Sequence, residues 1–347
     1  MYAHILQPYA KPDWPLIDHF RRRWPEATVH AGAIPSLRYR TKIGFLMQLP
    51  KLFVFGLRIG LQALRGEHAP KAFITHTDFE VLGLALAQVI RRKRVPIFLV
   101  GFIYTQRKSR LLTWLRQRYF KMVLHLSRGV ICHSTLETER YARLFDLPME
   151  RFGVVPFALN VDRPDTLEVK EGGYALSAGR AERDYGLLSR AWSGMNTDLH
   201  IVCDTAAPLQ PVAPSPRIKL LRQCFGADFL QEIAQADFVV VPLKDPELSA
   251  GQMVLLQSMS VGKPVIISRT PTTEEYGEHM KTLYFVEYGS EAALREAIRR
   301  LAGDADLRAR IGVAARRHYE ERHTVSAYTN GILTAVEGAF AQMPTKT

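Results

Sequence analysis

Residues 238–268 combine, within one short stretch, residue types whose order could bind a phosphate group. The β-branched run at 238–241 predicts a buried strand, and a polar loop leads from its carboxyl end to Gly251. A helix-compatible segment at 252–261 and an apolar strand at 265–267 complete a unit of the length that a right-handed βαβ crossover requires. The start of such a helix offers backbone N–H groups and a positive dipole end to an anion. An ordinary βαβ unit that binds nothing is the alternative.

Two arginines follow another predicted strand, Tyr174–Ala178. Guanidinium groups make forked, bidentate hydrogen bonds to phosphate oxygens, so Arg180 and Arg183 could together neutralise a leaving pyrophosphate. The other interpretation is a pair of surface arginines beside Glu182 and Asp184.

The elements that must position these residues alternate between strand and helix along the whole chain. In the first half we expect strands at 2–7, 72–75, 96–100, 129–133 and 153–156, and helices at 14–24, 80–92 and 136–144. After a polar segment at 160–169, strands recur at 174–178, 199–203, 218–221, 239–241 and 265–267, with helices at 185–192, 229–235, 252–261, 292–302, 306–321 and 326–341. This alternation predicts parallel sheets covered by helices, in two domains.

Four segments of the chain also resemble a known family. The sequence SAGQMVLLQSMSVGKPVI, which starts at Ser249, resembles the donor-site motif E-x-F-G-x-x-x-x-E-A-M-x-x-G-x-P-V-I of the retaining GT-B glycosyltransferases of family 4. The motif's two glutamates are replaced here by Ser249 and Gln257. The segments at 133–162, 177–192 and 225–243 resemble further stretches of the family, of which the second is its glycine–arginine donor loop.

The resemblance implies the α/β GT-B fold, in which two Rossmann-like domains place their parallel sheets facing each other across a cleft. Residues 1–160 would form a basic, acceptor-binding, membrane-associated domain, and residues 161–325 the domain that binds the nucleotide sugar. The last helix, at 326–347, would pack back on the N-terminal domain. The reaction would move a sugar from a nucleoside diphosphate sugar to a hydroxyl of an acceptor, with retention of configuration. The basic first half, rather than the resemblance, favours a glycan or lipid-linked acceptor at a membrane, in cell-surface polysaccharide or glycolipid synthesis. The resemblance implies no metal and no cofactor, and it leaves UDP and GDP both open.

By the same resemblance, Arg180 would clamp the donor diphosphate and act in catalysis, and Arg183 would take the role of a nearby lysine. Gln257 could hydrogen-bond a ribose hydroxyl, and Glu247 could substitute for the glutamate missing at Ser249. The residues expected to bind the donor diphosphate and nucleotide are Gly179, Arg180, Arg183, Lys244, Ser249, Gly251, Gln252, Met253 and Gln257. Cys224 and Phe225 are expected beside the base.

The first half offers one loop for acid–base chemistry, at residues 75–80. His76 or Asp78 could orient or deprotonate an acceptor hydroxyl, because the loop follows an apolar strand and precedes a helix. The alternative is that Thr77 or Asp78 only caps that helix. His133, at another strand end, is either a further candidate or a core histidine.

The excess of positive over negative charge lies entirely in the first half. Residues 1–160 hold 25 Lys and Arg against 10 Asp and Glu, whereas the remainder holds 21 against 24. This excess of Lys and Arg in one half predicts that the first half binds an anionic partner. The apolar segment at 43–64 could lie in a bilayer interface or form a core helix bent at Pro50, and the segment at 107–128 predicts a basic amphipathic helix or an ordinary surface helix. Basic patches beside apolar segments favour an anionic membrane, and no nucleic-acid-binding motif is present.

Composition and cysteine usage predict a cytoplasmic protein that is peripheral on the inner face of the cell membrane. The three cysteines are far apart and show no metal-ligand spacing, and the first residues do not read as a signal peptide. Two rival functions remain open. One is an inverting transferase or a sugar-nucleotide epimerase on the same fold, and the other is a membrane-binding scaffold that lost its chemistry with the two glutamates.

Overall fold

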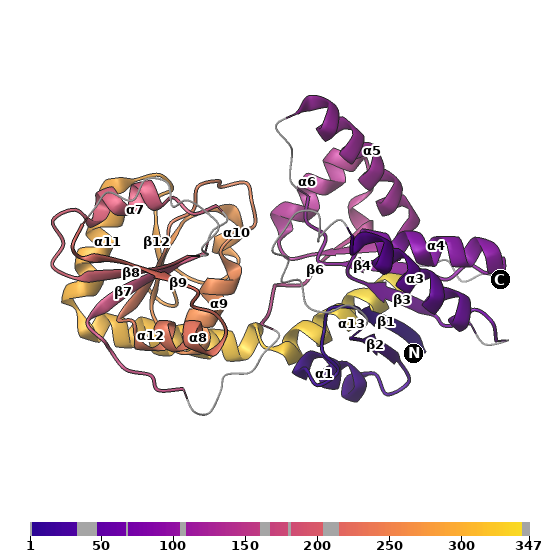
Figure 1. Cartoon of the computed structure of the whole chain (residues 1–347), viewed down its shortest axis with the longest axis horizontal. Helices are drawn as coiled ribbons and strands as arrows, with labels where there is room; N and C mark the ends of the chain where they lie inside the picture. Colours follow the sequence, from indigo (N-terminus) through magenta and orange to yellow (C-terminus); the bar gives the residue numbers. More distant parts are fainter. Residues whose placement is uncertain are drawn as a thin grey trace. The chain divides into compact units, whose positions relative to one another are not determined.

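The computed structural model describes residues 2–32, 47–66, 69–104, 109–159, 167–179, 182–203 and 215–341. The chain divides into two compact units (Figure 1). Unit 1 consists of Met1–Pro156 together with Val325–Thr347, and unit 2 consists of Phe157–Thr324.

Unit 1 contains a parallel sheet of six strands in the order β2-β1-β3-β4-β5-β6. The strands are β1 (Ala3–Gln7), β2 (Thr28–Ala31), β3 (Ala72–Thr75), β4 (Ile97–Val100), β5 (Gly129–Cys132) and β6 (Phe152–Val154). The helices are α1 (Pro15–Arg23), α3 (Leu49–Ala63), α4 (Asp78–Arg91), α5 (Arg110–Leu126), α6 (Thr135–Phe145) and α13 (Val325–Ala341), with a 3-10 turn at Met149–Arg151.

Unit 2 contains a second six-stranded parallel sheet, in the order β12-β11-β10-β7-β8-β9. The strands are β7 (Tyr174–Ala178), β8 (Asp198–Cys203), β9 (Ile218–Arg222), β10 (Phe238–Val241), β11 (Val265–Ser268) and β12 (Tyr284–Val286). The helices are α7 (Tyr185–Trp192), α8 (Ala227–Gln235), α9 (Gln252–Ser260), α10 (Pro271–Glu274), α11 (Glu291–Gly303) and α12 (Ala305–Arg322). Two parallel sheets with flanking helices confirm the predicted fold class.

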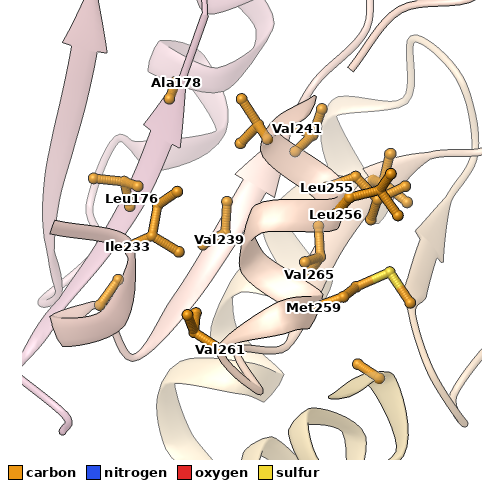
Figure 2. Packing of buried hydrophobic residues seen from close by; sticks show 14 of the residues in the cluster. Leu176, Ala178, Ile233, Val239, Val241, Leu255, Leu256, Met259, Val261 and Val265 are labelled. Carbon is orange, nitrogen blue, oxygen red and sulfur yellow. The ribbon is translucent and has the colours of Figure 1, made fainter. Parts of the chain in front are cut away.

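Both faces of the second sheet are covered, as a parallel sheet requires. Along β10, Val239 and Val241 belong to one apolar cluster, and Phe238 and Val240 belong to another. Figure 2 shows the first cluster, in which Val239, Val241 and Val265 of the strands share one apolar core with Leu255, Leu256 and Met259 of α9. The alternating side chains of one strand therefore anchor helices on opposite faces, and α9 is held rigidly against the sheet.

The order of the strands reverses at one place in each sheet, and this place decides where a ligand can bind. In unit 2 the reversal lies between β7 and β10, and in unit 1 it lies between β1 and β3. The loops that leave neighbouring strands at such a point run in opposite directions, which opens a crevice at the carboxyl ends of the strands. The turns after β7 and β10 are the two that carry the predicted diphosphate site.

Glycines allow α3 and α4 to pack with their backbones close together. A Cβ added at Gly83 would lie 2.3 Å from the carbonyl oxygen of Phe53, and one added at Gly56 would lie 2.6 Å from that of Glu80. The helix α3 begins at Leu49 with Pro50 in its first turn, where a missing N–H costs no helical hydrogen bond. Its buried face packs on α4, as a core helix would; residues 43–46 of the apolar segment lie outside the described residues.

In unit 2, the first residue, Phe157, is held by two aromatic side chains from elsewhere in the unit. The backbone N–H of Phe157 donates to the Tyr276 hydroxyl at 3.1 Å, and Nδ1 of His323 donates to the Phe157 carbonyl oxygen at 3.3 Å. The Tyr276 and His323 rings stack with 5.2 Å between centroids. Burial, and then the nearby His318, lowers the pKa of His323 to about 4.

We expect Gly83→Ala to destabilise unit 1 by about 1–3 kcal/mol, because a methyl group cannot enter a space bounded by backbone atoms. Gly338→Ala in α13 is the matched control, since a Cβ there meets nothing within 4 Å. It should be neutral or stabilising by up to about 1 kcal/mol through helix propensity. Urea unfolding followed by circular dichroism measures both; equal effects would contradict the close packing of α3 and α4.

We expect His323 to make stability fall in mild acid. Its folded-state pKa lies below the ordinary value of 6.5, so its stabilising contribution is complete above pH 6.5 and is lost as the pH falls towards 4. Between pH 7 and pH 5 the stability advantage of the wild type over His323→Gln should shrink by roughly 2 kcal/mol. Denaturant unfolding at the two pH values tests this, and an advantage that stays constant would show that His323 is not buried as a neutral ring.

Candidate active site

In unit 2, the loops after β7 and β10 are joined by backbone contacts. The Asp184 N–H donates to the Pro242 carbonyl oxygen at 3.0 Å, and the Lys244 N–H donates to the Glu182 carbonyl oxygen at 3.1 Å. Arg183 and Leu243 form an antiparallel bridge between these two contacts. The loop that carries Arg183 and the loop that leads to α9 are therefore fixed against each other at the point where the strand order reverses.

The guanidinium of Arg183 lies between two glycines of these loops. Its Nε donates to the Ala178 carbonyl oxygen at 2.8 Å. A Cβ added at Gly179 would lie 2.9 Å from Nη2 of Arg183, and one added at Gly251 would lie 4.0 Å from Nη1. The structure thus brings together Gly179, Arg183 and Gly251, which sequence reasoning assigned to one site from positions more than 60 residues apart.

Backbone conformation explains the residue type at both glycine positions. Gly179 has a φ of 103° and Gly251 a φ of 94°, values that side-chain-bearing residues rarely adopt. Gly251 is the N-cap of α9 and provides no side chain to cap the helix. The first N–H groups of α9 consequently point to a position where a ligand oxygen could accept from them.

The electrostatics of this position favour an anion. Burial lowers the pKa of Arg183 from its usual value, but a guanidinium stays charged in proteins. Its charge lies beside the positive end of the α9 dipole, so two positive centres converge on the same space. Tyr185 supports the turn, because its hydroxyl donates to the Gly179 carbonyl oxygen and burial raises the pKa of that hydroxyl.

The side chains of the predicted donor motif on and before α9 differ in what they contact. The Gln252 amide donates to the Ser249 hydroxyl, so these two side chains bind each other. Met253 is exposed. The Oε1 atom of Gln257 is buried and has no hydrogen-bond partner among the residues that the structure describes. A buried amide oxygen without a donor is suited to accept from a ligand hydroxyl.

Other predicted donor residues lie on loops around this turn. The side chain of Lys244 is exposed, and its carbonyl oxygen accepts from the Tyr288 hydroxyl. Glu247 is also exposed, and its N–H donates to Oδ1 of Asp245 at 2.8 Å. Arg180 lies outside the described residues, so its role stays a prediction.

The predicted base-binding residues lie on the loop between β9 and α8. Phe225 is 52% exposed, so part of this residue is accessible to a ligand. Burial raises the pKa of the Cys224 thiol, and Glu232 and Asp228 add to the effect, which keeps the thiol protonated. Gln223 and Gly226 have φ values of 60° and 61°, so this loop has left-handed residues on both sides of Cys224 and Phe225. The left-handed Gln223 was not predicted, and its residue type gives no signal for it.

In unit 1 both predicted acid–base residues, His76 and Asp78, form hydrogen bonds with other side chains or the backbone. Nδ1 of His76 donates to the Leu6 carbonyl oxygen at 3.2 Å, and Nε2 accepts from the Gln7 amide at 3.1 Å. Burial lowers the pKa of His76 to about 4, so the ring is neutral. Oδ2 of Asp78 accepts from the Tyr119 hydroxyl at 2.7 Å. Their roles in acceptor activation stay predictions.

Sequence reasoning missed a buried carboxylate in the same loop. Glu80 is fully buried, and its Oε2 accepts from the N–H groups of His76 and Thr77 and from the Thr75 and Thr77 hydroxyls. Burial raises its pKa to about 7 against the opposing effect of these hydrogen bonds. Thr77 caps α4 in a capping box with Glu80, as one of the two interpretations expected of this loop. The spacing of Thr77 and Glu80 could have revealed the box.

His133 occupies an equivalent position at the end of β5. It is buried, its Nδ1 donates to the Val155 carbonyl oxygen at 3.0 Å, and burial lowers its pKa. A Cβ added at Gly101 would lie 3.1 Å from Nε2 of His133, and Gly101 has a φ of 73°. The carboxyl edge of the first sheet therefore presents Gln7, His76 and His133 from three of its strands. Among the residues that the structure describes, no group of three or more His, Cys, Asp and Glu side chains could hold a metal ion.

Comparisons with known proteins agree with this geometry. Residues 179–304, which include Arg183, Gly251 and α9, match the sequence model of the family Glycosyl transferases group 1. No curated protein sequence matches the chain.

Several solved structures share the fold of the whole chain. HepE of Anabaena in complex with UDP-glucose superposes with a TM-score of 0.66 at 16% identity, over 97% of this chain and 99% of that one. Sucrose-phosphate synthase of Thermosynechococcus elongatus gives 0.69 at 14% identity, over 99% of this chain and 100% of that one. The lipopolysaccharide outer core galactosyltransferase WaaB gives 0.63 at 12% identity, over 99% and 100% of the two chains. The protein is therefore a glycosyltransferase with the GT-B fold, and its residues 179–304 match the sequence model of the group 1 glycosyltransferases.

Proposed function

We propose that the protein transfers a sugar from a nucleoside diphosphate sugar to a hydroxyl of a glycan or lipid-linked acceptor in cell-surface polysaccharide or glycolipid synthesis. The observation that carries the proposal is the Arg183 guanidinium held between Gly179 and Gly251 at the N-terminus of α9. Because HepE was solved with UDP-glucose and with UDP, UDP-sugars are the first donors to test. The name of WaaB, an outer core galactosyltransferase, supports a surface glycan as the class of acceptor.

Charge stabilisation on the leaving diphosphate is the main task of unit 2. As the bond from the sugar's anomeric carbon to the diphosphate breaks, negative charge develops on a phosphate oxygen. Arg183 and the first N–H groups of α9 would stabilise that charge, with Arg180 and Lys244 contributing from the flanking loops. Donors that are already fixed in place need no reorganisation, and the contacts that join the two loops keep Arg183 fixed.

The nucleoside would bind beside the same helix. The unsatisfied Oε1 of Gln257 would accept from a ribose hydroxyl, and the exposed ring of Phe225 would stack on the base. In unit 1, Asp78 or His76 would orient the acceptor hydroxyl, whose proton the leaving phosphate oxygen can take when the sugar's configuration is retained. We infer that the protein works at the inner face of the cell membrane, because the excess positive charge lies entirely in residues 1–160.

We expect Arg183→Ala to weaken the binding of UDP and UDP-sugars by about 10- to 100-fold, the cost of about 1.5–3 kcal/mol for charge-assisted hydrogen bonds. Arg183→Lys should recover part of the affinity, because it keeps the charge and loses the fork. Arg190→Ala, on the exposed side of α7, is the control and should bind like the wild type.

Thermal shift with a panel of UDP- and GDP-sugars measures these affinities, and the melting temperature of each free variant shows whether it folds. Product-anomer analysis by nuclear magnetic resonance then separates retention from inversion or epimerisation. Unchanged nucleotide affinity in Arg183→Ala would remove Arg183 from the site. A wild type that binds no donor at all would favour the scaffold without chemistry.

We also expect the transfer rate to be unchanged by a metal chelator, because Arg183 and the start of α9 supply positive charge where a metal ion otherwise would. Initial rates with and without EDTA, at saturating donor, test this. A rate that falls with EDTA and returns when Mg²⁺ or Mn²⁺ is restored would contradict the proposed role of these groups.

A further inference from the structure

The helix α5 has an apolar face that the core of unit 1 does not use. Leu111, Leu115, Met122 and Leu126 are all exposed, from 65% for Leu111 to 42% for Leu126. Their spacing of four, seven and four residues places them in one line along a helix. The opposite side of α5 packs inward through Val123 and Leu124, which are fully buried. The exposed line is therefore not required to hold the helix in place.

Basic and aromatic side chains accompany this line. Arg110 and Arg118 are exposed on the same side of α5, and the Arg118 guanidinium lies 5.4 Å from the centre of the Trp114 ring, which is itself 51% exposed. We call these side chains, Arg110, Leu111, Trp114, Leu115, Arg118 and Met122, the α5 stripe. Figure 1 shows that the N-terminal part of α5 extends beyond the sheet of unit 1. The side chains of the stripe are exposed.

The surrounding sequence contains no negative charge. From Val81 to Leu136 there is no Asp or Glu, whereas there are eleven Lys and Arg. Acids from elsewhere in the described part of the unit reach α5 at residues outside the stripe. Asp146 pairs with Lys121 at 3.3 Å, and Oδ2 of Asp78 accepts from the Tyr119 hydroxyl at 2.7 Å. The stripe is thus apolar and positively charged at once, a combination that fits a surface with negative headgroups above a hydrocarbon layer.

We propose that the α5 stripe docks the protein on an anionic lipid bilayer, with α5 lying along the membrane surface. The leucines and Met122 enter the boundary of the hydrocarbon, Trp114 lies at headgroup level, and the arginines bind lipid phosphates. The helix lies on the bilayer rather than through it, since no helix in the described part of the chain is long and apolar enough to span a membrane. The inference rests on the proposed function in naming a membrane-bound acceptor as the reason for docking.

A second copy of the chain is a poorer occupant of this surface. A two-fold symmetric contact would place Arg110 and Arg118 against the same residues of the other copy, where like charges repel in a desolvated interface. A bilayer with anionic headgroups neutralises these charges instead. Each basic residue near such a surface contributes about as much binding free energy as one buried CH₂ group, so the apolar and basic parts act together.

The test is flotation with vesicles of phosphatidylcholine alone and of phosphatidylcholine mixed with phosphatidylglycerol. The wild type should float with the mixed vesicles, and high salt should release part of it by screening the arginines. The variant carrying Leu111→Glu and Leu115→Glu, and the variant carrying Arg110→Glu and Arg118→Glu, should each lose at least tenfold in partition coefficient.

The controls carry charge changes of the same kind elsewhere. Val313→Glu, at a position 73% exposed on α12, and the pair Arg299→Glu and Arg310→Glu, on exposed turns of α11 and α12, should float like the wild type. Trp114 gives a direct signal, because its fluorescence should shift to shorter wavelength with mixed vesicles and Trp114→Phe should abolish that shift. The other tryptophans are buried or half-buried and should report little.

The outcomes separate docking from donor binding. Thermal shift with UDP should be the same for the stripe variants and the wild type, since unit 2 is unchanged. A wild type that does not float with anionic vesicles, or stripe variants that float as well as the controls, would overturn the inference. A stripe variant that changes the mass of the protein in solution without changing flotation would assign the stripe to a second copy. Flotation by a protein that binds no nucleotide would support the docking and refute the proposed function.

Discussion

The donor side of this protein depends on one constraint, which is that two loops at the carboxyl ends of β7 and β10 must meet closely enough to enclose the Arg183 guanidinium. The backbone contacts between residues 182–184 and 242–244 set the distance, and Gly179 and Gly251 provide the space. A side chain at either glycine would strain the backbone, and one at Gly179 would also collide with Arg183. The positive charge is in this way fixed beside the start of α9 by backbone geometry, before any ligand binds.

Unit 1 uses a different device at its strand ends. The turn from β3 to α4 and the turn from β5 to α6 each have a histidine, a hydroxyl residue that caps the helix, and a glutamate three residues after the cap. Glu80 accepts from the N–H of His76 at 3.2 Å, and Glu137 accepts from the N–H of His133 at 3.0 Å. Each buried carboxylate satisfies the backbone of the turn, so two neutral histidines are held at the same edge of the sheet. The sequence-based candidates in this half are thus fixed in place by residues that carry no predicted chemistry.

One side of the helix α5 packs in the core of unit 1, and the other side is exposed. Its inward side completes the apolar cluster around Phe102 and Tyr104, and Arg116 lies over the rings of Tyr104 and Phe120. Its outward side repeats large apolar residues that add nothing to this cluster. Apolar side chains exposed to water are unfavourable in free energy, and burial of those side chains in a bilayer removes this cost.

The sequence alone determined the fold class. Parallel strands that are buried on both faces appear as short apolar runs, and in the helices between them apolar residues recur every three to four positions. It also determined that a helix begins after Gly251, because glycine marks the ends of helices and strands through its local sequence context. It did not predict the edge strands β2 and β12, because an edge strand needs only part of the apolar run that a central strand needs. Only the tertiary structure decided that Arg183, rather than being a surface residue, lies against Gly251. The strands that carry these residues are adjacent in the sheet but more than 60 residues apart in the chain, and strand order depends on packing over the whole unit, which no local pattern encodes.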